Sequence, residues 1–295
     1  MLHNSQKDFI RRHIGPSEKD KEKMLKDLNF KSLDEFINST IPEKIQFKGE
    51  LNIGEPNSEY EALRKLKAIS KKNQIYSNFI GMGYYGTYTP YVILRNILEN
   101  PGWYTSYTPY QPEVAQGRLE MLLNFQQMIV DFTGMDIANA SLLDEGTAAA
   151  EAMGLSHRLN KSDSNLVFVS ENCHPQTIDV IQTRAEPMGL KVLVGNEDKV
   201  LEQLKEDIVC GVLQYPGTLG DIKDPSEAIS KIHKKNGKAI LVCDLLALSM
   251  LKTPRELGAD IAVGSSQRFG IPMGYGGPHA AFFATKDEYK RSMPG

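Results

Sequence analysis

The sequence is poor in several features that mark particular classes of protein. Its 295 residues include only three cysteines, and no two of them have a CxxC spacing, so neither a disulfide framework nor a cysteine zinc site is expected. The charge is nearly balanced, with 34 Lys and Arg against 37 Asp and Glu, and this leaves no basic field for nucleic acid. No apolar run approaches the ~20 residues of a membrane-spanning helix, and the first residues lack the apolar core of a signal peptide. We therefore expect a soluble protein of a reducing compartment, the cytoplasm.

The first 75 residues are rich in lysine and helical in pattern. Ser17 with Asp20 three positions later is typical of a capping box at the start of a helix. Residues 58–72 place their apolar side chains on one face of a second helix. We expect a helical N-terminal extension over residues 1–75, which could form a small core of its own or act as an arm that wraps a partner.

The composition changes sharply at residue 76. Residues 76–110 contain eight of the twelve tyrosines, the only tryptophan, and several glycines and prolines. This density favours ordered loops over long regular elements. A surface loop packed by its own aromatics would look like this, but we favour a binding loop or a subunit contact, because tyrosine suits both roles.

The rest of the chain alternates between helices and continuous apolar strands. A long amphipathic helix is predicted from Glu113 to Thr133, ended by Gly134. Strands are then predicted at 165–170, 191–195, 208–215, 238–244, 260–264 and 280–284, with helices at 147–159, 175–184, 199–204 and 225–234. The pattern predicts an α/β large domain over residues 76–295, with a mostly parallel sheet covered by helices on both faces.

Polar residues follow several of these strands, at the sheet edge where ligands of open α/β sheets bind. Asp244 closes one strand, and it could be an N-cap or a salt-bridge partner, or a carboxylate that faces a positively charged heterocycle or a metal. His174 follows another strand and could stack on a ring or simply cap a helix. Cys173 could be a nucleophile, but nothing beside it predicts a lowered pKa. Arg268, in a glycine-rich loop, could bind a carboxylate or a phosphate, or only solvent.

One predicted helix begins in a way that bears on phosphate binding. Gly146 and Thr147 are placed like residues whose backbone N–H groups cradle a phosphate at a helix N-terminus. Asp144 and Glu145 occupy the same turn, where they satisfy the helix dipole themselves and would repel a phosphate. The local sequence therefore argues against a phosphate bound by this chain.

Several motifs together resemble the P-protein of the glycine cleavage system, glycine dehydrogenase (decarboxylating), and specifically its N-terminal half, which in some organisms is a separate subunit 1. They are Arg12-His13-Ile14-Gly15-Pro16, Gly81-Met82-Gly83-Tyr84-Tyr85-Gly86, Tyr107-Thr108-Pro109-Tyr110-Gln111-Pro112-Glu113 with Gln116-Gly117-Arg118-Leu119-Glu120, and Gln267-Arg268-Phe269-Gly270-Ile271-Pro272. The resemblance implies a fold-type I pyridoxal-phosphate transferase architecture with a seven-stranded type of sheet. It also implies a smaller C-terminal domain, for which this chain is too short, so we expect a truncated product, a fragment or an incomplete gene model.

The resemblance implies a definite chemistry. In that family, glycine forms an imine with pyridoxal phosphate, loses CO₂, and passes its aminomethyl group to the lipoyl arm of the H-protein. The cofactor-bearing half has a lysine in a His-Lys-Thr-Phe-Cys-Ile-Pro signature, and Gln267 aligns with that lysine. An amide cannot form the Schiff base. We therefore expect the non-cofactor subunit of a heterodimer, inactive alone, whose lysine-bearing partner (subunit 2) holds the pyridoxal phosphate.

The resemblance implies that the other positions that align with cofactor-binding residues do not bind the cofactor in this chain either. Asp244 matches the residue that pairs with the pyridine nitrogen, and His174, Gly146 and Thr147 stand at further cofactor positions. No metal is expected.

The family places its active site between the two halves, so a degenerate half can line its partner's site. The residues predicted to do so, and to bind glycine, are Tyr84, Tyr85, Thr87, Tyr107, Tyr110, Gln111, Glu113 and Gln116. Tyrosine hydroxyls and glutamine amides can orient a carboxylate by hydrogen bonds. The alternative is a purely structural subunit whose tyrosine-rich loop packs an interface. A weaker hypothesis is an independent enzyme, such as a hydrolase that uses Cys173.

Overall fold

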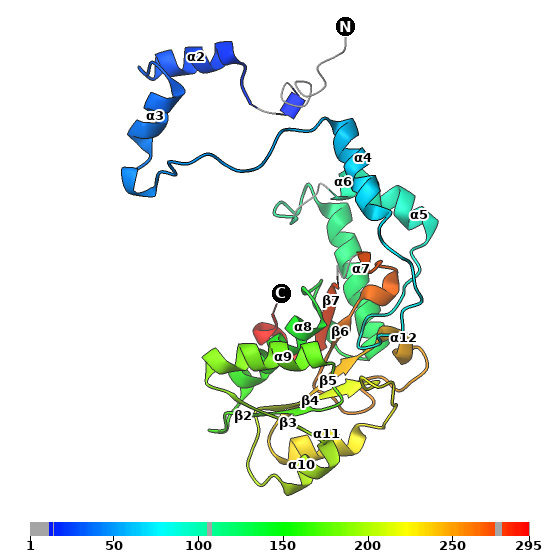
Figure 1. Cartoon of the computed structure of the whole chain (residues 1–295). Helices are drawn as coiled ribbons and strands as arrows, with labels where there is room; N and C mark the ends of the chain where they lie inside the picture. The colour runs from blue at the N-terminus through cyan, green and yellow to red at the C-terminus, as the bar shows by residue number, and fades with distance from the viewer. Residues whose placement is uncertain (1–11, 14, 105–107, 275–278, 295) are drawn as a thin grey trace. The chain divides into compact units, whose positions relative to one another are not determined.

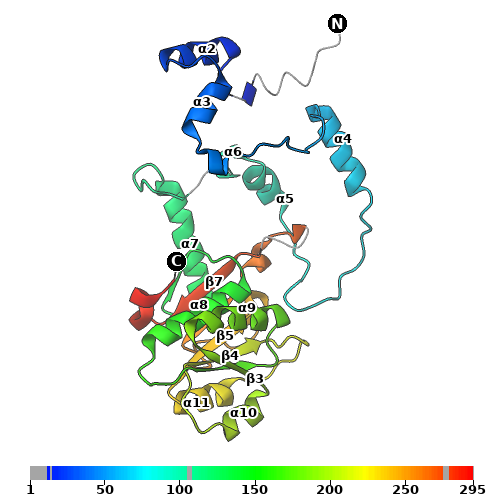
Figure 2. The ribbon, with the colours of Figure 1, turned by 60° about the vertical axis from the view of Figure 1, so that its left-hand side comes forward.

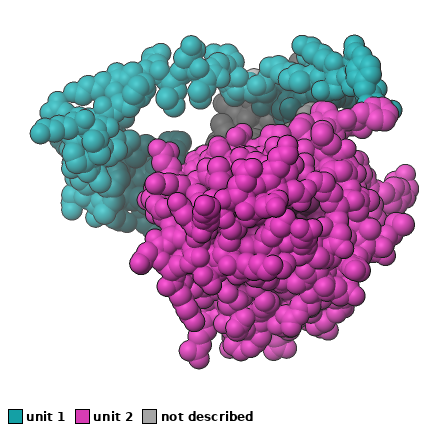
Figure 3. Space-filling model, turned by 90° about the horizontal axis from the view of Figure 1, so that it is seen from below, with its two compact units in different colours: residues 1–77 teal, residues 78–295 magenta. Residues whose placement is uncertain are grey.

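The computed structural model describes residues 12–13, 15–104, 108–274 and 279–294 (Figure 1). The chain divides into two compact units, Met1–Ser77 and Asn78–Gly295, which Figure 3 colours separately. Within the described ranges, no helix combines the length and the apolar character that a membrane crossing requires.

The first unit is a series of short helices. They are α2 (Glu18–Asp27), α3 (Leu33–Thr40), η1 (Glu43–Ile45) and α4 (Glu59–Ser70). The predicted capping box of Ser17 and Asp20 is present, and Ser58 forms a second one with Glu61. None of these four helices buries a residue, and Leu66 on the apolar face of α4 is 63% exposed. The described part of this unit therefore has no core of its own, which suits an arm better than an independent domain.

The second unit is built on a seven-stranded sheet. Its strands are β1 (Ile137–Ala138), β2 (Leu166–Ser170), β3 (Lys191–Gly195), β4 (Cys210–Tyr215), β5 (Lys238–Cys243), β6 (Ile261–Ser265) and β7 (Ala281–Thr285). The order is β1-β7-β6-β5-β4-β2-β3. The five strands from β6 to β3 run parallel, and β7 is antiparallel to both of its neighbours. The predicted α/β class and the mostly parallel sheet are thus confirmed.

Helices cover both faces of this sheet, as the two views in Figures 1 and 2 show. The longer ones are α7 (Gln116–Thr133), α8 (Glu145–Leu159), α9 (Pro175–Ala185), α10 (Glu197–Gln203) and α11 (Ser226–Lys234). The short ones are η3 (Glu186–Met188), α12 (Leu245–Leu248), η4 (Gln267–Phe269) and η6 (Asp287–Ser292). In both views α8 and α9 lie on one side of the sheet, and α10 and α11 lie on the other.

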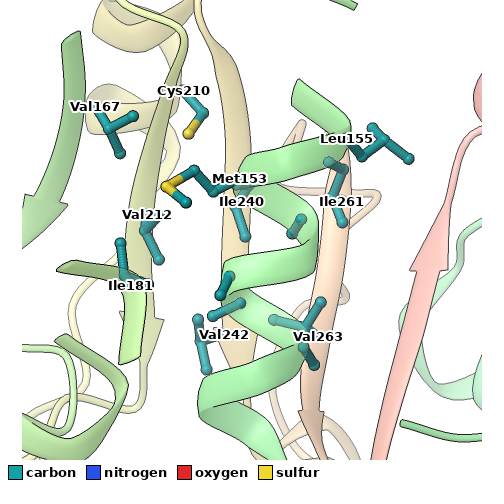
Figure 4. Packing of buried hydrophobic residues seen from close by; sticks show 14 of the residues in the cluster. Met153, Leu155, Val167, Ile181, Cys210, Val212, Ile240, Val242, Ile261 and Val263 are labelled. Atoms are coloured by element: carbon teal, nitrogen blue, oxygen red, sulfur yellow. The ribbon is translucent and has the colours of Figure 1, made fainter. Parts of the chain in front are cut away.

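Each face of the sheet has its own apolar core. Met153 of α8 packs with Val242 and Val263 on one face (Figure 4). Leu241 and Ala262, their neighbours along the strands, belong to the cluster on the opposite face. Strand residues point alternately to the two faces, so strands buried on both sides must be apolar throughout. This is why the strands read as unbroken apolar runs.

The described residues of the tyrosine-rich segment (76–104 and 108–110) form only short helical turns, as expected. These are α5 (Tyr91–Ile93), the π-helical turn η2 (Leu94–Leu98) and α6 (Pro101–Tyr104). The predicted start of the next helix at Glu113 is wrong by three residues, because the backbone N–H of Ala115 closes a turn onto the carbonyls of Gln111 and Pro112. Its predicted end is right, since Gly134 adopts φ 68° and its N–H caps the carbonyl of Val130.

Candidate functional site

A small cavity lies at the carboxyl ends of the central strands. Its volume is about 50 Å³, and its lining residues are Gly83, Tyr85, Thr87, Glu145, His174, Gln214, Pro216, Cys243, Asp244, Ser265, Gln267 and Arg268. We call it the central pocket. Parallel strands end at the same edge, which is why residues from β4, β5 and β6 meet here with the starts of α8 and α9.

Gln267 lies at the base of the central pocket. It opens η4 just beyond β6, and only 3% of it is exposed. Its backbone N–H donates to Ser265 Oγ at 3.2 Å, whereas its side-chain Nε2 has no hydrogen-bond partner. The residue that aligns with an imine-forming lysine is therefore buried at the mouth of the sheet, and its amide has no basic amine for that reaction.

Asp244 is held by groups of this chain. One carboxylate oxygen caps α12 by accepting the N–H of Leu246 at 3.2 Å. Arg268 binds both oxygens, from Nε and Nη2, at 2.9 Å each, and its guanidinium stacks over the ring of Tyr85 at 4.4 Å from the centroid. Both structural interpretations of Asp244, the N-cap and the salt bridge, hold in this structure. A pyridinium nitrogen would have to displace the arginine.

His174 is buried at the start of α9. Its Nδ1 lies 3.0 Å from Thr218 Oγ1, and burial lowers its pKa to about 4, so the ring is neutral near pH 7. Gly83 packs directly on this ring. A Cβ at Gly83 would lie 3.3 Å from the ring, and its φ of +85° disfavours any other residue. The turn around Gly83 is therefore fitted closely to the histidine.

Glu145, the first residue of α8, faces the same pocket. Burial, and then the negative charges of Asp244 and Asp144, raise its pKa to about 7. Its Oε1 is 3.7 Å from Nε2 of His174, but the two form no ion pair near pH 7, because the histidine is neutral there. The pocket thus holds a carboxyl group that is half-protonated at neutral pH.

These residues do not fit pyridoxal phosphate. Gln267 offers no amine, and Asp244 is already occupied by Arg268. At the start of α8, Asp144 Oδ1 accepts the N–H of Thr147 at 2.7 Å, so that amide is not free for a phosphate. Glu145 adds a second acid in the same turn. The amine, the ring-nitrogen partner and the phosphate cradle are each missing from this pocket.

Three of the predicted glycine-binding residues lie at or beside this pocket. Tyr85 and Thr87 line it, and Thr87 Oγ1 donates to the carbonyl of Ile271 at 2.7 Å. Tyr84 lines an adjoining cavity of about 180 Å³, which also includes Gly146. The structure thus brings Tyr84, Tyr85 and Thr87 together with the aligned cofactor positions.

Tyr110, Gln111, Glu113 and Gln116 lie near the start of α7 and line neither cavity. All four of these residues are exposed. Tyr107 lies outside the described residues. A groove of about 520 Å³ opens beside this segment.

Sequence reasoning missed two side chains of the site, Gln214 and His279. Gln214 interrupts the apolar run of β4, which was the available signal, and it lines the central pocket. His279 lies in the adjoining cavity, with its ring edge-on to Tyr84 at 4.9 Å. The Cys173 hypothesis finds no support, since this thiol is 1% exposed and burial raises its pKa. In the part of the chain that the structure describes, no group of three or more His, Cys, Asp or Glu side chains could hold a metal ion.

Comparison with known proteins gives consistent matches over nearly the whole chain. The family model described as Glycine cleavage system P-protein matches residues 11–295. A glycine dehydrogenase (decarboxylating) of Pelagibacter ubique is 81% identical over 295 residues, which are 100% of this chain and 31% of that protein. The protein of the same name from Nostoc punctiforme is 58% identical over 97% of this chain and 29% of its own length. This chain therefore spans about three tenths of the length of these curated relatives.

Two solved structures are similar to this chain in fold. A crystal structure of glycine decarboxylase (P-protein) of the glycine cleavage system, in inhibitor-bound form, superposes with a TM-score of 0.86 and 33% identity, over 96% of this chain and 64% of that chain. A sphingosine-1-phosphate lyase of Burkholderia pseudomallei shares the fold, with a TM-score of 0.62 and 12% identity, over 84% of this chain and 62% of that chain.

Proposed function

The chain belongs to the glycine cleavage system P-protein family, and we propose that it forms the half of a glycine decarboxylase that does not hold the cofactor. Its fold is that of pyridoxal-phosphate-dependent transferases. In this proposal, pyridoxal phosphate held by the other, lysine-bearing half supplies the electron sink for decarboxylation of glycine. The aminomethyl group then passes to the lipoyl arm of the H-protein.

The observation that supports this proposal most is the content of the central pocket. Gln267 stands at the end of β6 where the cofactor-bearing half is expected to have its lysine. Arg268 fills the place opposite Asp244 where the cofactor ring would be met. Two independent changes thus oppose a cofactor on this chain, and reversing one of them would not restore the site.

The partner half is expected as subunit 2. The curated relatives are about three times as long as this chain, because it covers 31% of the first of them, so one polypeptide of their length has room for both halves. The two halves would make the same contact whether they are separate subunits or parts of one polypeptide.

We assign to this chain the positioning of glycine in the partner's site. Tyr110, Gln111 and Glu113 are exposed in the segment that precedes α7, which supports a contact with a second half there. Hydroxyl and amide groups there would orient the carboxylate of glycine and hold it for reaction. Tyr107 and Gln116 belong to the same segment and the same proposal.

A purely structural role is the second candidate, and one observation favours it for part of the loop. Tyr85 stacks on Arg268, and Thr87 is bonded to the carbonyl of Ile271. These two side chains are engaged within this chain, as expected of residues that only pack. Tyr84 and the segment beside α7 then decide between the two candidates.

The test combines this chain with the lysine-bearing half and measures glycine decarboxylation per assembled complex. Gln111→Ala should lower kcat/KM by about tenfold, the loss of one or two hydrogen bonds, with assembly intact. Gln127→Ala is the matched control, since Gln127 is exposed on α7 and bonds only Asp131. An unchanged rate with weakened assembly would establish the structural role. A chain that is yellow and active without the other half would overturn the proposal.

A further inference from the structure

Unpartnered polar atoms converge on the central pocket and its neighbour. Glu145 Oε1, Gln214 Oε1 and Gln267 Nε2 are buried without hydrogen-bond partners, and all three residues line the central pocket. His279 Nε2 is also buried without a hydrogen-bond partner, and His279 lines the adjoining cavity. Glu145 lines both this cavity and the central pocket. Buried polar atoms without partners are rare, so a group of them around one space indicates a ligand that completes their bonds.

The charges around the pocket indicate the sign of the charge that the ligand should carry. The charged and titratable groups around Glu145 are Tyr84, Tyr85, Asp144, Cys173, His174, Cys243, Asp244, Arg268 and His279. Among the described lining residues, Arg268 is the one permanent cation, and its Nε and Nη2 bind the two oxygens of Asp244. His174 is neutral and burial keeps Cys243 protonated. Glu145, which lines both cavities, and Asp144, which lines the adjoining one, are therefore paired with no cation among these groups, and the ionised form of Glu145 favours a cation in the pocket.

The shape limits the ligand to a few atoms. A volume of about 50 Å³ accommodates roughly three to five water-sized groups. The roof is preformed, because Gln176 Nε2 donates to the carbonyl of Met82 at 2.7 Å and Gly83 packs on His174. Such a space suits a ligand of about five non-hydrogen atoms.

We propose that the central pocket binds a small molecule with a primary ammonium group. Its N–H bonds would go to Glu145 Oε1 and Gln214 Oε1, which are both acceptors without a donor in this structure. Gln267 Nε2, a donor without an acceptor, would bind a carboxylate at the far end of a zwitterion. The groups that would bind this ligand all come from this chain, so binding can be tested without the lysine-bearing half.

Calorimetric titration of the full chain, without the lysine-bearing half, tests the inference with methylammonium, glycine and acetate as probes. Methylammonium and glycine should bind, and acetate should not. Glu145→Gln should weaken the binding of both ammonium probes at least tenfold, whereas Glu151→Gln, a half-buried position of the same helix that pairs with Arg184 of α9, should change neither. Gln267→Leu should weaken glycine several-fold more than methylammonium, and equal effects on the two would show an amine site without zwitterion recognition and overturn the role given to Gln267.

The pH dependence gives a readout that needs no variant. Because the pKa of Glu145 is about 7, its ionised fraction rises about tenfold between pH 6 and pH 8, and the affinity for methylammonium should rise by the same factor. Affinity that stays constant over this range, or no binding of either ammonium probe at millimolar concentration, would overturn the inference. Pockets filled by water alone would give that second result. A failure of the ammonium probes to bind would leave glycine decarboxylation by the assembled halves unaffected. This inference and the proposed function can therefore fail separately.

Discussion

Replacing Glu145 by Gln should stabilise the chain, and more so at high pH. Burial, aided by Asp244 and Asp144, raises the pKa of this carboxyl from 4.5 to about 7. Between these two values the folded state holds a proton that the unfolded state has lost, so the stability of the wild type falls as pH rises. A pKa raised from 4.5 to about 7 corresponds to a destabilisation of roughly 3 kcal/mol once pH exceeds 7, but of only about 1 kcal/mol at pH 5. The neutral amide avoids this cost.

The measurement is the free energy of unfolding in urea at pH 5 and pH 8, without added amines. Glu145→Gln should gain about 2 kcal/mol relative to the wild type between the two pH values. Glu151→Gln is the control, because Glu151 pairs with Arg184 at 2.6 Å on the outer side of the same helix, and its loss should cost no more than ~1 kcal/mol. A Glu145→Gln variant that is equally stabilised or destabilised at both pH values would refute the assignment of a buried carboxyl with a raised pKa.

The remaining predictions concern stability, measured by urea unfolding unless stated. Although burial opposes it, hydrogen bonds from His233, Lys286 and the Ala239 N–H lower the pKa of Asp260 to about 2. Asp260→Asn should therefore lower the free energy of unfolding by about 2 kcal/mol at pH 7, and this loss should vanish as pH falls from 4 to 2. A loss that stays constant over this pH range would contradict the prediction. Arg268→Met should cost about 1–3 kcal/mol by leaving Asp244 unpaired, and adding Asp244→Asn should recover part of that loss; strictly additive effects would exclude the pair. Gly83→Ala should lower the thermal midpoint through a cost of about 1–2 kcal/mol, and an unchanged midpoint would contradict the close packing on the ring of His174.

The strands of the sheet were predictable from the sequence because each strand has a hydrophobic pattern that can be recognised within its own few residues. A strand buried on both faces has to be apolar at every position, and the predicted strand at 191–195 matches β3. The strand β1 was missed, since two residues, Ile137 and Ala138, form no pattern. The start of α7 was placed too early at Glu113, because a proline followed by an acid resembles a helix start and in this chain belongs to a turn.

The site was predictable in its position but not in its pairings. Asp244, His174 and Gln267 could be placed together, because the ends of parallel strands meet at one edge. The bond between Arg268 and Asp244 depends on side chains 24 residues apart, and no local pattern records it. The burial of Glu145 also arises only when α8 packs over the sheet, so its sequence position showed an acid in a first turn and nothing of its raised pKa.

The most direct test of the account is to find which lysine binds the cofactor. This chain and the lysine-bearing half are combined with pyridoxal phosphate, reduced with borohydride to fix any imine, digested, and analysed by mass spectrometry. The account predicts a pyridoxyl group on the lysine of the His-Lys-Thr signature in the other half and on no peptide of this chain. A pyridoxyl-lysine recovered from this chain in an amount that matches the active sites would contradict it.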